Sequence, residues 1–220
     1  MRLFLFLLFA MLFSVAAFSQ NISILQDPLS SRIFNIEKYA EIRGTPFLAD
    51  KWTRGSVVTT RGIYENLELK YNVYDNALFF NKNEEAFELQ DEIVSFTLMH
   101  KPGTPESYSV YKKGITGPGL SVEQFVQVLA EGAVDLYRLD LKHVSEMSEV
   151  NAGIVKTFTG GIKYYAEKDK AVTLIKADKE SVLLLLADKA DQVKGFITSN
   201  RISFRKEEDL VKVFKYYNSL

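Results

Sequence analysis

The clearest pattern along the chain is an alternation of apolar and polar residues within residues 62–80. The apolar positions are Leu67, Leu69, Tyr71 and Val73, and the polar positions between and after them are Glu68, Lys70, Asn72 and Tyr74. Such a period of two is typical of a β-strand that is buried on one face. The pair Asp75-Asn76 then favours a tight turn. We therefore predict that residues 62–80 form a β-hairpin at the centre of an antiparallel sheet.

Similar alternation, interrupted by turn residues, recurs along much of the chain. It predicts further strands at residues 52–60, 86–90, 93–99, 107–112, 134–144, 162–166 and 172–176. In the strand at 134–144 the apolar positions shift by one residue near Tyr137-Arg138, which indicates a β-bulge. In the second hairpin, at 162–176, we expect Ala166 and Val172 to share a face. Short strands with closely spaced turns are typical of an antiparallel meander, sandwich or open barrel, here of about eight or nine strands.

Three segments have apolar residues at helical spacing. A short middle helix is predicted after Ser121, with Phe125, Val128 and Leu129 on one face. Asp178 is the expected cap of a second helix, and the acidic run at residues 207–209 begins a third. The apolar stripes of these two helices consist of Val182, Leu185, Leu186, Val193, Phe196 and Ile197, and of Leu210, Val213, Phe214 and Tyr217.

Two amphipathic helices need an apolar surface to cover, and the apolar face of the hairpin at 62–80 is the one that we expect them to cover. The predicted fold is therefore α+β, with a mainly antiparallel sheet packed by two C-terminal amphipathic helices and one short middle helix. Residues 21–50 fit a helix about as well as a strand and stay unassigned. Residues 151–161 are interpreted as a linker.

Residues 1–19 have the features of a secretory signal peptide. Arg2 supplies the positive charge, residues 3–13 are apolar, and Ala17 and Ser19 fit the small positions before a cleavage site. We predict cleavage after Ser19, which leaves a single α+β domain at residues 20–220 and no later segment apolar enough to span a membrane. The alternative is an uncleaved N-terminal membrane anchor.

The composition narrows the class of protein. The chain has no cysteine, so the fold has no disulfides and there is no cysteine to receive a lipid. We therefore expect a freely diffusing periplasmic or secreted bacterial protein. The formal net charge of −1 does not favour a nucleic-acid partner. The expected partners are an envelope protein, a peptide or a glycan.

The sequence contains no motif that predicts catalysis, a metal site or a cofactor. The two histidines, His100 and His143, stand alone, and no G-x-S-x-G pattern is present. The carboxylates lack the spacing of a calcium loop. The loop at 117–119 precedes a predicted helix but lacks the Gly-Lys-Ser/Thr of a phosphate-binding loop. We therefore assign no catalytic residue, no metal ligand and no cofactor.

Tyrosine is frequent, with 11 residues in the chain. Tyrosines on a sheet are ordinary cross-strand partners, but they can also line an aromatic groove for a glycan, a peptide or an apolar ligand. The candidate ligand-binding residues are Glu68, Lys70, Tyr74, Tyr108 and Tyr137. The polar face of the hairpin is the part that we expect to stay free for recognition.

Several segments together carry a resemblance that spans nearly the whole mature chain. They are Gly44-Thr45-Pro46-Phe47-Leu48, residues 52–57, Gly62 with Tyr64, Leu69-Lys70-Tyr71-Asn72, Lys215-Tyr216-Tyr217-Asn218, and Phe18-Ser19-Gln20 at the end of the signal peptide. In these segments the chain resembles a family of uncharacterised exported proteins of Bacteroidetes. The resemblance implies a periplasmic or cell-envelope location. Its motifs are structural, so it implies no activity and no site residue.

Three hypotheses about function follow from these patterns. The first is a non-enzymatic binding or interaction module of the bacterial envelope. The second is a glycosidase-like hydrolase that uses two carboxylates, with Glu68 or Glu92 as a candidate. The third is a carrier that holds a small apolar ligand in a barrel cavity.

Overall fold

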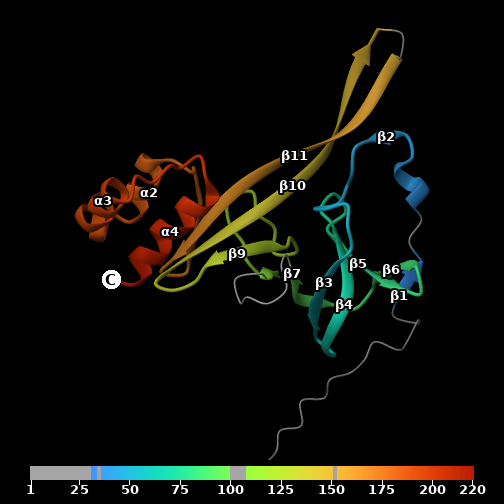
Figure 1. Ribbon diagram of the computed structural model, residues 1–220, viewed down its shortest axis with the longest axis horizontal. Coiled ribbons are helices and arrows are strands. Elements are labelled where there is room, and N and C mark those ends of the chain that lie inside the picture. The colour runs from blue at the N-terminus through green and yellow to red at the C-terminus, as the bar shows by residue number, and fades with distance from the viewer. Residues whose placement is uncertain (1–30, 34–35, 100–107, 151–152) are drawn as a thin grey trace, which may run out of the picture.

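The computed structural model describes residues 31–33, 36–99, 108–150 and 153–220, and most of them belong to one extended sheet (Figure 1). The predicted signal peptide at 1–19, residues 20–30 of the unassigned segment and His100 lie outside the described residues. The described part of the unassigned segment holds two short strands, β1 (Ser31–Ile33) and β2 (Ile42–Arg43), and between them a short 3-10 helix, η2 (Ile36–Tyr39).

Across the described residues the sheet has twelve strands, more than the eight or nine predicted. Besides β2 they are β1 (Ser31–Ile33), β3 (Thr53–Thr59), β4 (Gly62–Asn72), β5 (Ala77–Lys82), β6 (Glu85–Leu89), β7 (Ile93–Met99), β8 (Tyr108–Lys112), β9 (Val126–Ala130), β10 (Val134–Glu149), β11 (Gly153–Lys168) and β12 (Ala171–Ile175). Their order is β1-β6-β5-β4-β3-β7-β8-β9-β10-β11-β12, with antiparallel pairing throughout this path. The short β2 pairs in parallel with β11, which makes the sheet mixed.

The predicted hairpin is confirmed as β4 and β5. Leu69 pairs with Phe80, Tyr71 pairs with Leu78, and Asn76 in the turn has a φ of 53°. Asparagine tolerates this left-handed conformation better than most residues, which explains its place in the turn.

The apolar face of this hairpin is buried, but the C-terminal helices do not cover it, so that prediction is wrong. Leu69, Tyr71 and Val73 belong instead to an aromatic core formed by strands β3 to β8 and Phe125. The other members of this core are Val57, Leu78, Phe80, Leu89, Ile93, Phe96, Leu98 and Tyr111. These strands bury their apolar side chains against one another, so no separate layer is needed there.

The C-terminal helices cover the other end of the sheet (Figure 1). They are α2 (Lys179–Leu185), α3 (Ala190–Ser199) and α4 (Glu207–Asn218), and a short 3-10 turn, η4 (Ala187–Lys189), divides the first predicted helix into α2 and α3. The Asp178 cap is confirmed, because its carboxylate accepts a hydrogen bond of 2.8 Å from the Ser181 N–H. The helices pack on Val134, Leu136 and Ala166, and together they form a second, helical core.

Two segments differ in type from their prediction. The segment after Ser121 is strand β9 and not a helix, and residues 153–161 belong to strand β11 and not to a linker. The face assignment in the second hairpin is also wrong, because Val172 pairs with Glu167 and therefore lies opposite to the face of Ala166. The pairing of β10 with β9 does shift between Leu136 and Tyr137, but the extra residue is Leu129 on β9. β10 itself pairs with β11 without interruption, so the bulge predicted within residues 134–144 is wrong.

Candidate functional site

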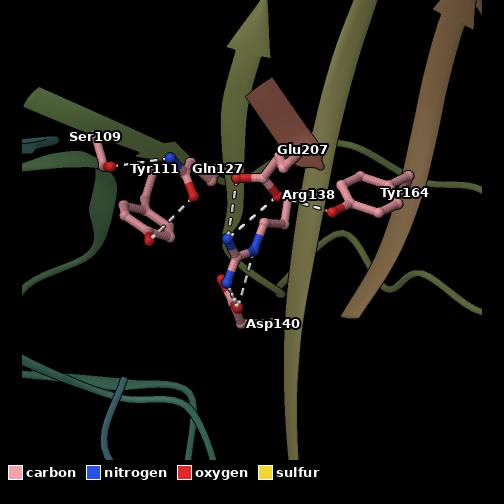
Figure 2. Close-up of polar contacts among 7 residues, drawn as sticks. All are labelled: Ser109, Tyr111, Gln127, Arg138, Asp140, Tyr164 and Glu207. Carbon is pink, nitrogen blue, oxygen red and sulfur yellow. Dashed lines mark hydrogen bonds and ion pairs between the residues drawn. The ribbon is translucent and has the colours of Figure 1, made fainter. Parts of the chain in front are cut away.

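A row of polar side chains crosses the sheet between the aromatic core and the helical core. Arg138 on β10 pairs with Tyr164 on β11 and with Gln127 on β9, and Gln127 pairs with Tyr111 on β8. Directly paired residues of antiparallel strands lie on the same face. The row therefore joins the two cores on one face of the sheet, as Figure 2 shows for the side chains.

Arg138 is held by two carboxylates from different elements (Figure 2). Its Nε and Nη2 donate to Asp140 Oδ1 at 3.1 and 2.6 Å, and its Nη1 donates to the two oxygens of Glu207 at 3.1 and 3.2 Å. Asp140 lies two residues further along β10, on the same face, because side chains alternate along a strand. Glu207 comes from the first turn of α4, where its charge also suits the helix dipole.

The remaining members of the row are also hydrogen-bonded. The Tyr164 hydroxyl donates to Glu207 Oε2 at 2.9 Å. On the other side, the amide nitrogen of Gln127 donates to the Ser109 hydroxyl at 2.9 Å, and the Tyr111 hydroxyl donates to the amide oxygen of Gln127 at 3.4 Å. These contacts form two separate groups: Glu207 ties α4 to β10 and β11, and Gln127 ties β9 to β8.

Burial dominates the electrostatics of the cluster. Burial raises the pKa of Asp140 above its usual range, although the Arg138 charge opposes this effect. Burial lowers the pKa of Arg138, but the carboxylates of Asp140 and Glu207 outweigh it, so the pKa is raised. Burial and the hydrogen bond to Glu207 raise the pKa of Tyr164 to about 12. Arginine and tyrosine therefore keep their protons at neutral pH.

One oxygen of the cluster lacks a partner. The Asp140 side chain is only 9% exposed, and among the described residues no group donates a hydrogen bond to its buried Oδ2. A buried acceptor without a donor costs free energy, more so when it is charged, and most buried polar atoms of folded proteins are satisfied. Asp140 Oδ2 is therefore a buried acceptor whose hydrogen-bonding capacity is unused among the described residues.

Asp140 lies at a groove of about 360 Å³ between the β10–β11 hairpin on one side and Leu48, which precedes β3, and Val73, in the β4–β5 turn, on the other. The groove is lined by Leu48, Val73, Arg138, Asp140, Leu141, Lys142, Gly160, Gly161 and Ile162. Gly160 pairs with Lys142 and so lies on the same face as Asp140, where it brings no side chain into the groove. The groove combines aliphatic walls with one cationic and one anionic group near its centre, and Lys142 adds a second cation.

The predicted ligand-binding residues are not brought together in this groove. Glu68 is exposed on β4 and accepts a hydrogen bond of 2.8 Å from Asn81. The Lys70 ammonium lies over the rings of Phe47 and Trp52, at 4.3 and 5.8 Å from their centroids, and burial lowers its pKa. These contacts place the segment from Phe47 to Trp52, which precedes β3, on the polar face of the hairpin.

Further contacts cover that face at its other end, so the expectation that all of it stays free is wrong. Tyr74 packs edge-on against Phe158, with ring centroids 5.2 Å apart. Asn72 is fully buried, and its amide donates to the Tyr39 hydroxyl at 2.8 Å. Of the four residues predicted on the polar face, Glu68 and Tyr74 are exposed.

Tyr108 and Tyr137 lie in two other places. Tyr108 is half exposed and lines a second hollow of about 250 Å³, together with Arg54, Gly55, Ser56, Glu65, Asn66, Thr97 and Met99. Tyr137 is completely buried, and its hydroxyl donates to Asp135 and Glu167 at 2.8 and 3.0 Å. A ring in that position does not line a groove.

The hydrolase candidates Glu68 and Glu92 do not form a pair. Glu68 pairs with Arg54 at one end of β3, whereas the Glu92 carbonyl accepts a hydrogen bond from Thr60 just beyond its other end. The two positions lie opposite residues six apart along β3, which is roughly 20 Å, beyond the carboxylate spacing of either glycosidase geometry. Asp140 and Glu207 do share a site, because both contact the Arg138 guanidinium.

Sequence reasoning missed the Arg138 cluster. A signal was present, because Arg138 and Asp140 continue the face that begins with the apolar Val134 and Leu136, where further apolar residues are expected. Glu207 is 69 residues away from Arg138, and local pattern does not connect them. Within the part of the chain that the structure describes, no group of three or more metal-binding side chains is found.

No helix in the described residues is both long and apolar enough to cross a membrane. Comparisons of the chain with protein-family models, with curated proteins and with solved structures returned no match.

Proposed function

We propose that this chain is an exported envelope protein that binds a small hydroxylated ligand, such as a sugar unit, in the groove at Asp140, without catalysis. The observation that carries this proposal is the buried Asp140 Oδ2, which lacks a donor among the described residues. A ligand hydroxyl supplies such a donor when the Asp140 side chain turns toward the groove, a movement that binding requires because this oxygen has almost no exposed surface. A hydrogen bond to a charged acceptor contributes about 1.5 to 3 kcal/mol, so one such contact has a measurable effect on affinity.

The size and the charge of the groove support a small neutral ligand. A volume of about 360 Å³ lies at the low end of the range for small-molecule sites, which suits one or two sugar rings. The positive charges of Arg138 and Lys142 balance the negative charges of Asp140 and Glu207, so the groove favours neither a cation nor an anion. Aliphatic side chains such as Leu48 and Ile162 can contact the C–H surface of a ring.

Binding can be measured by calorimetry and by saturation-transfer NMR with glucose, galactose, N-acetylglucosamine and myo-inositol, and with glutamate and lysine as charged comparisons. We expect Asp140→Asn to weaken binding of a neutral probe roughly 10- to 100-fold, because the amide is a poorer acceptor. Glu68→Gln makes the same chemical change on the outer face of the hairpin and should leave affinity unchanged. An unchanged affinity of Asp140→Asn, or no binding of any neutral probe to the wild type, contradicts the proposal.

A second candidate is a glycosidase, because Asp140 and Glu207 contact the same guanidinium and burial raises the pKa of Asp140. Its weakness is that Arg138 occupies the space between the two carboxylates and engages three of their four oxygens. Turnover of nitrophenyl glycosides that is lost in both Asp140→Asn and Glu207→Gln would favour this candidate over simple binding. The apolar carrier has less support, because the rings of Tyr71, Phe96 and Phe125 pack against one another in the aromatic core.

A further inference from the structure

The hairpin of β10 and β11 extends well beyond the rest of the sheet (Figure 1). Both strands have 16 residues, longer than most strands of globular proteins. On its outer side, β10 pairs with β9 only from Leu136 to Arg138. Beyond Arg138, no described strand pairs with this side of β10. The outer edge from Leu139 to Glu149 therefore presents backbone groups without strand partners among the described residues.

A long open edge is a template for another strand, and folded proteins usually protect such edges. Apolar side chains near the end of this hairpin are also exposed, with exposed fractions of 68% for Met147, 91% for Val150 and 71% for Ile154. Exposed apolar residues that gather in one region are typical of an interaction surface. These two features together indicate that the edge has a partner.

We propose that the partner is a second copy of this chain, which adds its own β10 antiparallel to the first about a two-fold axis at Val144. A two-fold axis perpendicular to a sheet keeps each side chain on its original face. Because directly paired residues of antiparallel strands share a face, the axis must pass through a residue and not between two residues. The choice of register is therefore restricted to a few centres along β10.

Charge selects the centre among these registers. With the axis at Val144, Lys142 of each copy pairs with Glu146 of the other, so two opposite-charge pairs form, and Leu141 pairs with Met147. An axis at His143 places Asp140 opposite Glu146, which is repulsive. An axis at Glu146 places the two copies of that carboxylate against each other. An axis at Ser145 leaves Lys142 opposite Ser148 and gains no charge pair.

The charge pairs can be reversed and restored. We expect the wild type to dimerise with increasing concentration in sedimentation velocity, and Lys142→Glu or Glu146→Lys to raise the dissociation constant at least roughly tenfold, because attraction becomes repulsion at two sites. The double variant should recover the dimer. Lys194→Glu makes the same charge change on the exposed surface of α3 and should have no effect. Circular dichroism of each variant checks that it is folded.

The absence of cysteine permits a test of the axis itself. Val144→Cys places one thiol of each copy beside its symmetry mate, so a short bismaleimide or mild oxidation should link the copies rapidly in dilute solution. Ser148→Cys, which has no thiol opposite in this register, should link much more slowly. A monomer at every concentration, a dimer insensitive to the charge changes, or equal linking of both cysteine variants contradicts the proposal. Ligand binding at Asp140 is measured separately, so either proposal can fail without the other.

Discussion

The two halves of the sheet bury their apolar residues in different ways. Strands β3 to β8 form the aromatic core among themselves, with Phe96 stacked on Tyr111 at 4.8 Å and edge-on to Phe125 at 5.0 Å. Strands β9 to β12 bury one face under α2, α3 and α4 instead. The opposite face of that half packs on Leu120, in the loop that precedes β9. In the first half the strands bury their apolar side chains against one another, whereas in the second half the helices and a loop cover the sheet.

This difference explains why a polar cluster lies between them. The helical layer reaches this part of the sheet only with the first turn of α4, at Glu207, and the aromatic core ends near Tyr111. Arg138 and Asp140 lie on the sheet between them, where neither core covers them fully. Partial cover leaves the groove open at Asp140. The candidate site is therefore a consequence of joining two differently covered halves.

The largest expected effects come from removing one ring in each half. Phe96→Ala and Phe214→Ala each remove a buried side chain, and each should lower the free energy of unfolding by about 3 to 5 kcal/mol. Trp52 is the only tryptophan and lies beside the aromatic core half, so its fluorescence follows that half during urea unfolding, whereas circular dichroism at 222 nm follows the helices.

If residues 20–220 form a single domain, as predicted, the two probes give the same transition in both variants. Loss of the helical signal in Phe214→Ala, with the Trp52 signal retained, would show that the two halves unfold independently.

Breaking the cluster between the halves should have the next largest effect. Arg138→Ala leaves Asp140 and Glu207 without their shared cation, and we expect a loss of about 3 kcal/mol in urea unfolding at neutral pH. Arg138→Lys keeps the charge but loses the forked geometry, so its loss should be smaller. Equal stability of Arg138→Ala and the wild type would mean that the cluster does not hold α4 to the sheet.

A smaller effect is expected at the start of the helical half. Asp178→Ala removes the side-chain cap of α2, which should cost about 1 kcal/mol in thermal or urea unfolding. Asp191→Ala, an exposed position in the first turn of α3, serves as the matched control and should change stability by less than about 0.5 kcal/mol. A similar loss of stability in both variants would show that the Asp178 cap contributes no more than any acidic residue in a first helical turn.

The smallest effect concerns pH. The pKa of Asp140 is raised in the folded protein, so the fold binds this proton more tightly than the unfolded chain does. The contribution to stability is complete below the unfolded pKa of about 3.9 and is lost as the pH rises through the folded pKa. The stability of the wild type relative to Asp140→Asn should therefore fall with rising pH over this window, as measured by urea unfolding at several pH values. A rise of this stability difference with increasing pH would contradict the prediction.

Pattern alone predicted much of the aromatic half. Strands β3, β7 and β8 alternate between buried and more exposed residues, so the pattern marks them clearly. The strand β9 was mistaken for a helix because Phe125, Val128 and Leu129 also fit helical spacing, and short apolar runs do not separate the two periods. The Gly160-Gly161 pair and the polar residues before it concealed the first half of β11.

The site was harder to predict, and β10 shows the reason. Both of its faces are buried near Leu136 and Tyr137, one under the helices and one under a loop, so the apolar shift in the sequence marks two covered faces and not a bulge in β10. An inward Arg138 has no evident partner until Glu207 is placed by the fold of the last helix. Long-range contacts of this kind follow from topology and not from local period.

The most direct measurement is a crystal structure of the protein soaked with the neutral sugar that binds most tightly in solution. We predict that a ligand hydroxyl lies in the groove at hydrogen-bond distance, roughly 2.6 to 3.0 Å, from Asp140 Oδ2. A ligand bound elsewhere, with Asp140 Oδ2 satisfied by a protein group instead, would contradict the account.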